Sequence, residues 1–168
     1  MTNSIKTFSN YFAILLFTSF LAACATAPTE TTSSTSTSQS QVVGGVYVGT
    51  ETIEMLAVDV PDRVFFAYDS YSLAASAQAT LNKQAKWLKA NPSVAIAVEG
   101  HADERGTREY NLALGDRRAS SVKDYLMSQG ISSNRISTIS YGKERPVKSG
   151  SNDTAWAQNR RSVSVRTN

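Results

Sequence analysis

The sequence is poor in residues that build covalent or metal-based frameworks: its 168 residues include a single cysteine, Cys24, and a single histidine, His101. One cysteine cannot close an intramolecular disulfide, and one histidine falls short of the ligand set of a zinc hydrolase. The formal net charge of +3 is too small for the basic stripe of a nucleic-acid-binding protein. We therefore expect no disulfide scaffold, no metal or other cofactor, and no nucleic-acid partner.

Long hydrophobic runs are also scarce, and the main one lies near the N-terminus, from Tyr11 to Phe20. It is shorter than the about 20 apolar residues that span a bilayer. One charge, Lys6, precedes it, and Leu21-Ala22-Ala23 and then Cys24 follow it. This order resembles a bacterial lipoprotein signal, so we expect residues 1–23 to be removed and Cys24 to carry lipid. An ordinary signal peptide with a cysteine nearby is the alternative.

The rest of the chain divides by composition into a linker and one domain. Residues 24–41 are rich in threonine, serine and glutamine and have almost no charge, which is typical of a flexible tether. Residues 42–168 are long enough for one domain with its own core. Within Val42–Val60, the segment Val46–Val48 suits a short strand, and Ile53–Val60 suits either a strand or a helical turn.

From Arg63 onward, apolar spacing predicts strands that alternate with helices. Leu73, Ala77, Leu81, Ala85 and Leu88 mark the buried face of a first helix, which ends at Asn91-Pro92 and which Ser70 or Ser72 could cap. The other expected elements are strands near 64–66, 94–98, 135–141 and 161–165, a long helix over 108–129 and a short one over 153–159. This order favours an α+β fold in which two main helices pack on one face of a small mixed sheet.

The long helix carries two stripes that follow a polar loop, His101–Gly106. Leu112, Gly115, Ala119, Val122 and Leu126 predict its core face, and a second stripe predicts the edge of that face: Asn111, Leu114, Arg118, Ser121 and Tyr125. Arg118 then points toward Asp103, at the end of the preceding strand. An anion and a planar cation close together suit a zwitterionic ligand, although the two groups could also form an ordinary surface ion pair.

Two motifs in this region resemble a known family. Gly100-His101-Ala102-Asp103, followed by Asn111-x-x-Leu114-Gly115-x-x-Arg118-Ala119-x-x-Val122, is similar to the signature of the OmpA-like peptidoglycan-binding domain. Gly100–Asn111 and Ser140–Pro146 resemble more closely the lipoproteins of the Tol-Pal system within that family. The resemblance covers roughly Arg63 to Val165 and implies an OmpA-like βαβαβ-type sandwich.

The resemblance implies an outer-membrane lipoprotein whose periplasmic domain binds peptidoglycan non-covalently through meso-diaminopimelate and so holds the outer membrane to the cell wall. Asp103 would accept from the ligand ammonium and Arg118 would pair with its carboxylate. The groove residues that the resemblance adds are Asp69, Tyr71, Arg105, Asn111 and Leu114. Ala25 agrees with this destination, because aspartate at that position retains lipoproteins in the inner membrane. The implied partners are TolB, a periplasmic propeller protein, and other Tol-Pal components.

Two alternatives belong to other classes of function. Glu99, Asp103 and Glu104 could in principle serve as the acid and base of a glycan hydrolase, but the sequence shows no apolar pocket that would raise the pKa of one of them. We therefore expect a protein that is not an enzyme. The domain could also anchor a different envelope complex, in which case TolB would not be its partner.

Overall fold

The computed structural model describes residues 42–43, 46–47 and 55–167. The expected signal peptide, the lipidated Cys24 and the linker up to residue 41 lie outside the described residues. The strand β2 (Val46–Tyr47) lies within the expected short strand, Val46–Val48, and pairs antiparallel with β1 (Val42–Val43), which was not predicted. For Ile53–Val60, where a strand and a helical turn were both expected, the structure has strands. The strand β3 (Met55–Ala57) pairs antiparallel with β4 (Val60–Pro61) across a turn in which Asp59 has a positive φ of 58°.

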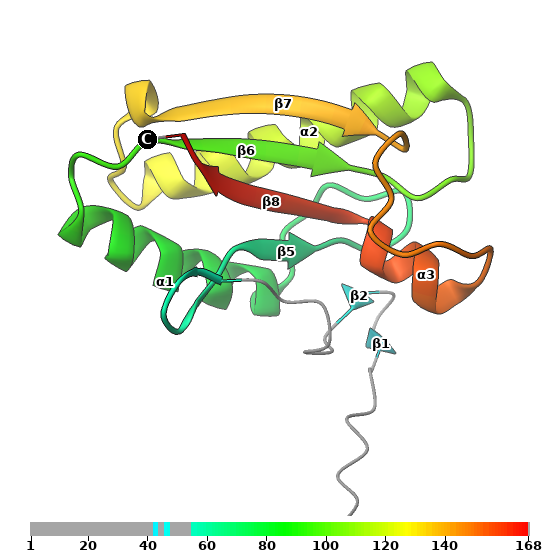
Figure 1. Cartoon of the computed structure of the whole chain (residues 1–168), viewed down its shortest axis with the longest axis horizontal. Helices are drawn as coiled ribbons and strands as arrows, with labels where there is room; N and C mark the ends of the chain where they lie inside the picture. The colour runs from blue at the N-terminus through cyan, green and yellow to red at the C-terminus, as the bar shows by residue number, and fades with distance from the viewer. Residues whose placement is uncertain (1–41, 44–45, 48–54, 168) are drawn as a thin grey trace, which may run out of the picture. The chain divides into compact units, whose positions relative to one another are not determined.

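The described residues form a main sheet in the order β5-β8-β6-β7 (Figure 1). Its strands are β5 (Arg63–Phe65), β8 (Arg161–Arg166), β6 (Ile96–His101) and β7 (Ile136–Gly142). The strand β8 pairs antiparallel with both β5 and β6, whereas β6 and β7 are parallel. A parallel pair needs a crossover between its strands, and the long helix provides it.

The helices are α1 (Ala75–Ala90), α2 (Arg108–Ser128) and α3 (Asp153–Asn159), with a 3-10 turn, η1 (Ser133–Arg135), before β7. Side chains of Thr107 and Asn152 cap α2 and α3 by accepting from backbone N–H groups in the first turn. The predicted serine cap of α1 is wrong. Its cap residue is Ala74, and the hydroxyl oxygen of Ser70 accepts from the N–H of Ser72 instead, because both serines lie in the turn before the helix.

The core lies between the sheet and the two long helices, as expected of an α+β fold. The predicted face of α1 is buried at Ala77, Leu81, Ala85 and Leu88. These side chains pack with Phe66, which follows β5, and with residues of α2 and the strands, which include Val64, Ile96, Val98, Ala119, Val122, Leu126 and Ile136. Figure 1 shows α2 behind β6 and β7, and α1 beside β5.

The buried face of α2 differs from the predicted one at its N-terminal end. Leu112, predicted in the core, is 49% exposed, whereas Asn111, Leu114 and Arg118 are buried. The cause is a backbone contact: a Cβ on Gly100 would lie 1.9 Å from the carbonyl oxygen of Gly115. Because two glycines let the helix rest directly on β6, the side chains that flank this contact turn toward the sheet end, and Leu112 turns away.

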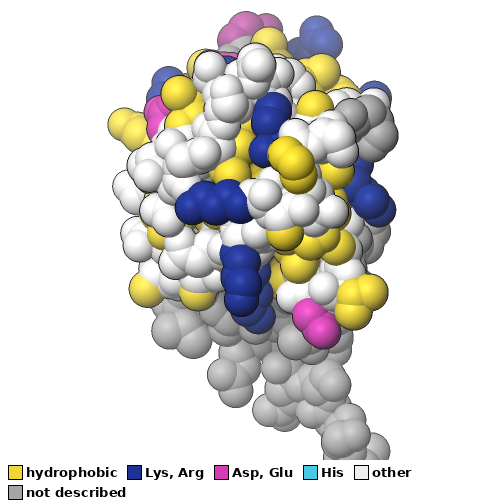
Figure 2. Space-filling view, turned by 90° about the vertical axis from the view of Figure 1, so that its left-hand side faces the viewer, with side chains coloured by type: hydrophobic (Ala, Val, Ile, Leu, Met, Phe, Trp, Pro, Cys, Tyr) yellow, Lys and Arg dark blue, Asp and Glu magenta, His cyan; other side chains and the backbone are white. Residues whose placement is uncertain are grey.

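The two ends of the sheet carry different parts of the chain. Figure 2 shows the end that lies on the left in Figure 1, where lysine and arginine side chains are scattered among apolar ones. The loops that follow β5 and β6 meet at the other end, together with the start of α2 and α3 (Figure 1). Among the described helices, none has the length and apolar character needed to cross a membrane.

Candidate functional site

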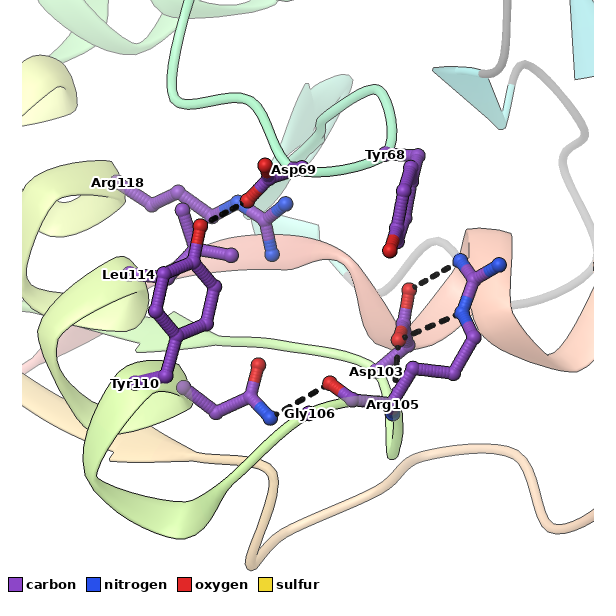
Figure 3. Close-up of a pocket in the computed structure, with 9 residues that line it drawn as sticks. Tyr68, Asp69, Asp103, Arg105, Gly106, Tyr110, Leu114 and Arg118 are labelled. Atoms are coloured by element: carbon purple, nitrogen blue, oxygen red, sulfur yellow. Dashed lines mark hydrogen bonds and ion pairs between the residues drawn. The ribbon is translucent and has the colours of Figure 1, made fainter.

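A cavity of about 180 Å³ opens where the β5–α1 loop faces the β6–α2 loop and the first turns of α2. Figure 3 shows two carboxylates and two guanidiniums converging on it. The lining residues are Tyr68, Asp69, Asp103, Arg105, Gly106, Tyr110, Asn111, Leu114 and Arg118. A single cavity therefore presents groups of both charge signs.

The loop between β6 and α2 is held in place from both sides. The amide nitrogen of buried Asn111 donates to the carbonyls of Arg105, at 2.8 Å, and Thr107, at 3.0 Å. The ammonium of Lys143, which follows β7, donates to the carbonyl of Gly106 at 2.7 Å. Gly106 has a φ of 93°, which favours glycine. These bonds fix the loop that carries Asp103 and Arg105.

Arg118 is fully buried and ties three segments together. Its Nε donates to the carbonyl of Ser70 at 2.8 Å, and its terminal nitrogens donate to the carbonyls of His101, at 2.8 Å, and Ala67, at 3.2 Å. Burial, with repulsion from Arg160, lowers the pKa of Arg118 to about 10, so its guanidinium stays charged at neutral pH. The side chain is therefore a structural link between the two loops as well as part of the cavity wall.

Asp103 is buried and lies between two guanidiniums. Its oxygens accept from Arg105 Nε at 3.1 Å and from Arg105 Nη2 at 2.7 Å, and Arg160 Nη1 lies 3.4 Å away. Burial by itself would raise the pKa of Asp103, but hydrogen bonds from the side chain and backbone of Arg105, the charge of Arg105 and the bond from Arg160 outweigh it and hold the pKa below its usual value. An exposed Asp103–Arg118 ion pair, the alternative raised from the sequence, is wrong.

The opposite wall is closed by a hydrogen bond that the sequence did not suggest. The hydroxyl of Tyr110, on the first turn of α2, donates to the carboxylate of Asp69, on the β5–α1 loop (Figure 3). That bond and the negative charge of Asp69 raise the pKa of Tyr110. Asp69 has a φ of 49°, a conformation that aspartate and asparagine tolerate better than most residues. The bond joins the two loops across the cavity.

Six of the seven predicted groove residues line this cavity: Asp69, Asp103, Arg105, Asn111, Leu114 and Arg118. Tyr71 does not line it. This residue is 49% exposed, and its ring lies beside Arg117, with 5.6 Å between the ring centre and the guanidinium carbon. Sequence analysis missed Tyr68, Gly106 and Tyr110. Their positions in the sequence could have indicated them, because each directly precedes or follows a predicted groove residue.

His101 was expected in the polar loop that follows the strand, but it belongs to the strand itself. It ends β6, is 1% exposed, and its ring stacks on Tyr141. Glu99 Oε2 lies 3.4 Å from His101 Nε2, but burial and the charges of Arg161, Arg145 and Arg63 prevail and lower the pKa of His101 to about 3. The ring is therefore neutral at physiological pH. Among the described residues, no group of three or more potential metal ligands comes together.

Comparison with known proteins defines the class of this domain. Residues 65–160 match the model of the OmpA family. This span includes the sheet end and every residue that lines the cavity. The chain therefore belongs to the OmpA family.

Within that family, the chain is similar to one group of lipoproteins. Over 108 residues the chain is 59% identical to the peptidoglycan-associated lipoproteins of Brucella melitensis and Rhizobium meliloti. The matched region makes up 64% of this chain and 64% and 61% of those relatives, so the chain covers less than two thirds of their length. The crystal structure of the peptidoglycan-associated lipoprotein from Burkholderia pseudomallei superposes with a TM-score of 0.62 at 43% identity, over 63% of this chain and 90% of that one.

Proposed function

We propose that this protein is a non-enzymatic outer-membrane lipoprotein that binds peptidoglycan through meso-diaminopimelate and thereby holds the outer membrane to the cell wall. The names of the relatives support peptidoglycan binding and a lipid anchor. The observation that carries the proposal is the cavity, in which Asp69 and Asp103 face Arg105 and Arg118. A second pocket also combines two carboxylates, Asp62 and Glu99, with guanidiniums, but the motif that resembles the OmpA-like family supplies Asp103, Asn111, Leu114 and Arg118 to the first cavity.

The chemistry of the ligand matches these groups. The side chain of diaminopimelate ends in a carbon that bears both an ammonium and a carboxylate. A guanidinium has five N–H donors, and carbonyls of the described residues take three from Arg118, so donors remain for a ligand carboxylate. Asp69 is exposed and carries negative charge on the wall opposite Asp103. The cavity can therefore meet both charges of the zwitterion.

The expected affinity of one site is moderate. Hydrogen bonds to charged groups contribute about 1.5–3 kcal/mol each, and ordering of the peptide and the site offsets part of this gain. Many membrane-anchored copies facing a polymer with repeated stems would gain from a high effective concentration. Individual sites can then release and rebind while the attachment as a whole persists.

The test is sedimentation of the full chain, in mild detergent, with isolated peptidoglycan. Asp69→Asn removes the charge, keeps an acceptor for Tyr110 and tolerates the positive φ. Asp59→Asn is the matched control, because Asp59 is also exposed and also has a positive φ, of 58°, but lies outside the cavity. We expect Asp69→Asn to weaken binding by about 10- to 100-fold, the loss of one charge-assisted bond, and Asp59→Asn to bind as wild type does.

Three outcomes count against the proposal. The first is a wild-type chain that stays in the supernatant with peptidoglycan containing diaminopimelate. The second is equal binding to peptidoglycan that carries lysine in place of diaminopimelate, because lysine lacks the terminal carboxylate that Arg118 is proposed to bind. The third is an equal loss of binding in Asp69→Asn and Asp59→Asn, because the site would then not lie in this cavity.

The anchor and the protein partners are proposed on sequence and family grounds. Lipid on Cys24 would hold the chain in the outer membrane with the domain in the periplasm, and TolB and other Tol-Pal components would be its partners. Labelling with radioactive palmitate tests the anchor, since Cys24→Ser should abolish incorporation. Recovery of TolB with the full chain after cross-linking tests the partner; recovery of a different envelope complex without TolB would favour the alternative anchor role.

A further inference from the structure

Trp156 does not line the cavity, yet it is in contact with the cavity's charged centre. Its ring lies against the guanidinium of Arg105, with the guanidinium carbon 4.1 Å from the ring centre. Tyr68 lies at the same distance, 4.1 Å, from that carbon. Arg105 is thus held by two aromatic rings while its nitrogens pair with Asp103.

The indole is itself fixed in position. Its Nε1 donates to Oε1 of Glu104 at 2.9 Å, so the residue before Arg105 anchors the ring that packs on Arg105. Trp156 lies on α3, and the residue that follows this helix, Arg160, donates to the carbonyl of Phe66 at 3.0 Å and approaches Asp103. The helix α3 therefore supports the anionic side of the cavity through two side chains.

We propose that Trp156 is a positioning residue of the binding site, which holds the guanidinium of Arg105 on the carboxylate of Asp103 before any ligand arrives. The role in binding rests on the proposed function, whereas the positioning of Arg105 does not. Arg105 needs a contact that restrains it, because its side chain is 32% exposed and an arginine at the surface would otherwise sample many rotamers. The aromatic contact restricts it to the orientation that forms the bidentate pair.

In this orientation Arg105 occupies most of the hydrogen-bonding positions of Asp103. Four contacts occupy its two oxygens, and three of them come from Arg105, including its backbone N–H at 3.1 Å. A carboxylate has about four acceptor positions, so these contacts satisfy Asp103, and the orientation of Arg105 decides whether one position opens to a ligand ammonium. Freeing Arg105 would therefore raise the pKa of Asp103 and release acceptor positions on its oxygens.

The experiment compares Trp156→Ala, Trp156→Phe and Trp87→Ala in the full chain. Phenylalanine keeps a ring for Arg105 but loses the bond to Glu104. Trp87 is the matched control, because it also has an arginine near its ring, Arg166 at 5.7 Å, but packs against the core on α1 and does not line the cavity. Binding to a muropeptide that carries meso-diaminopimelate is measured at a temperature at which circular dichroism shows each variant folded.

Two NMR measurements report on positioning independently of ligand: the pKa of the Asp103 carboxyl, from a titration of its carbon shift, and the Nε–H signal of Arg105. For Trp156→Ala we expect about 3- to 30-fold weaker binding, the range of a cation–π contact. We also expect a higher pKa of Asp103 and a broadened Arg105 signal. Trp156→Phe should lie near wild type, and Trp87→Ala should change neither binding nor these signals.

A Trp156→Ala variant with an unchanged pKa of Asp103 and a sharp Arg105 signal would overturn the proposal, even if its binding were weaker. Tighter binding would also overturn it, because Arg105 would then obstruct the ligand. If wild type fails to bind the muropeptide, the proposed function fails, while the two NMR measurements still decide whether Trp156 positions Arg105.

Discussion

Replacement of Arg118 by methionine should destabilise the whole domain. The substitution keeps a long side chain that suits a helix, but removes the donors to the carbonyls of Ala67, Ser70 and His101. A buried acceptor that loses its donor costs about 1–3 kcal/mol, so three of them cost roughly 3–9 kcal/mol. The expected effect is large because these bonds join segments far apart in the chain.

Removal of the buried charge offsets part of this cost. Burial lowers the pKa of Arg118 from its ordinary value to about 10, which means that about 3 kcal/mol act against the charged form. The net loss in the free energy of unfolding is then centred on about 3 kcal/mol, a large part of the roughly 5–15 kcal/mol of a typical domain.

Urea denaturation followed by circular dichroism measures the change. Arg117→Met is the matched control, because Arg117 is the preceding residue of α2 and is exposed; its free energy of unfolding should change by less than about 1 kcal/mol. A similar result, below about 1 kcal/mol, for Arg118→Met would refute the view that Arg118 links the loops. It would also make Arg118 variants, which we expect to be too unstable, suitable for binding measurements.

Three further predictions concern residues that support the strand and the helix on either side of the cavity. Gly100→Ala should lower the free energy of unfolding by about 3 kcal/mol in urea denaturation, because its Cβ would collide with the carbonyl oxygen of Gly115; a wild-type midpoint would contradict the close contact. Thr107→Ala should cost about 1 kcal/mol by removing the cap of α2, and an unchanged melting temperature would count against the cap. The pKa of His101 is lowered to about 3 in the folded state, so its contribution is present above its unfolded pKa of about 6.5 and is lost as pH falls from there toward 3. This loss amounts to at most about 5 kcal/mol; His101→Gln should lack that part of the pH dependence, and equal slopes for both proteins would refute the assignment.

Much of the secondary structure was predictable because it depends on local spacing. The apolar residues at three- and four-residue intervals predicted α1 and α2, and the observed α2, Arg108–Ser128, ends within one residue of the expected bound. Most of the cavity residues were predictable for another reason: Asp103, Asn111 and Arg118 lie in a motif similar to that of the OmpA-like family, and the family assignment is confirmed.

What the sequence alone determined, then, is the order of the elements, the family and most of the residues around the cavity, since periodicity and motif are properties of neighbouring residues. The tertiary structure decided how those residues are used. It buried Arg118 on three carbonyls, exposed Leu112 through the contact of Gly100 with Gly115, and brought Trp156 onto Arg105. Each of these outcomes depends on contacts between segments distant in the chain, which no local pattern of residues contains.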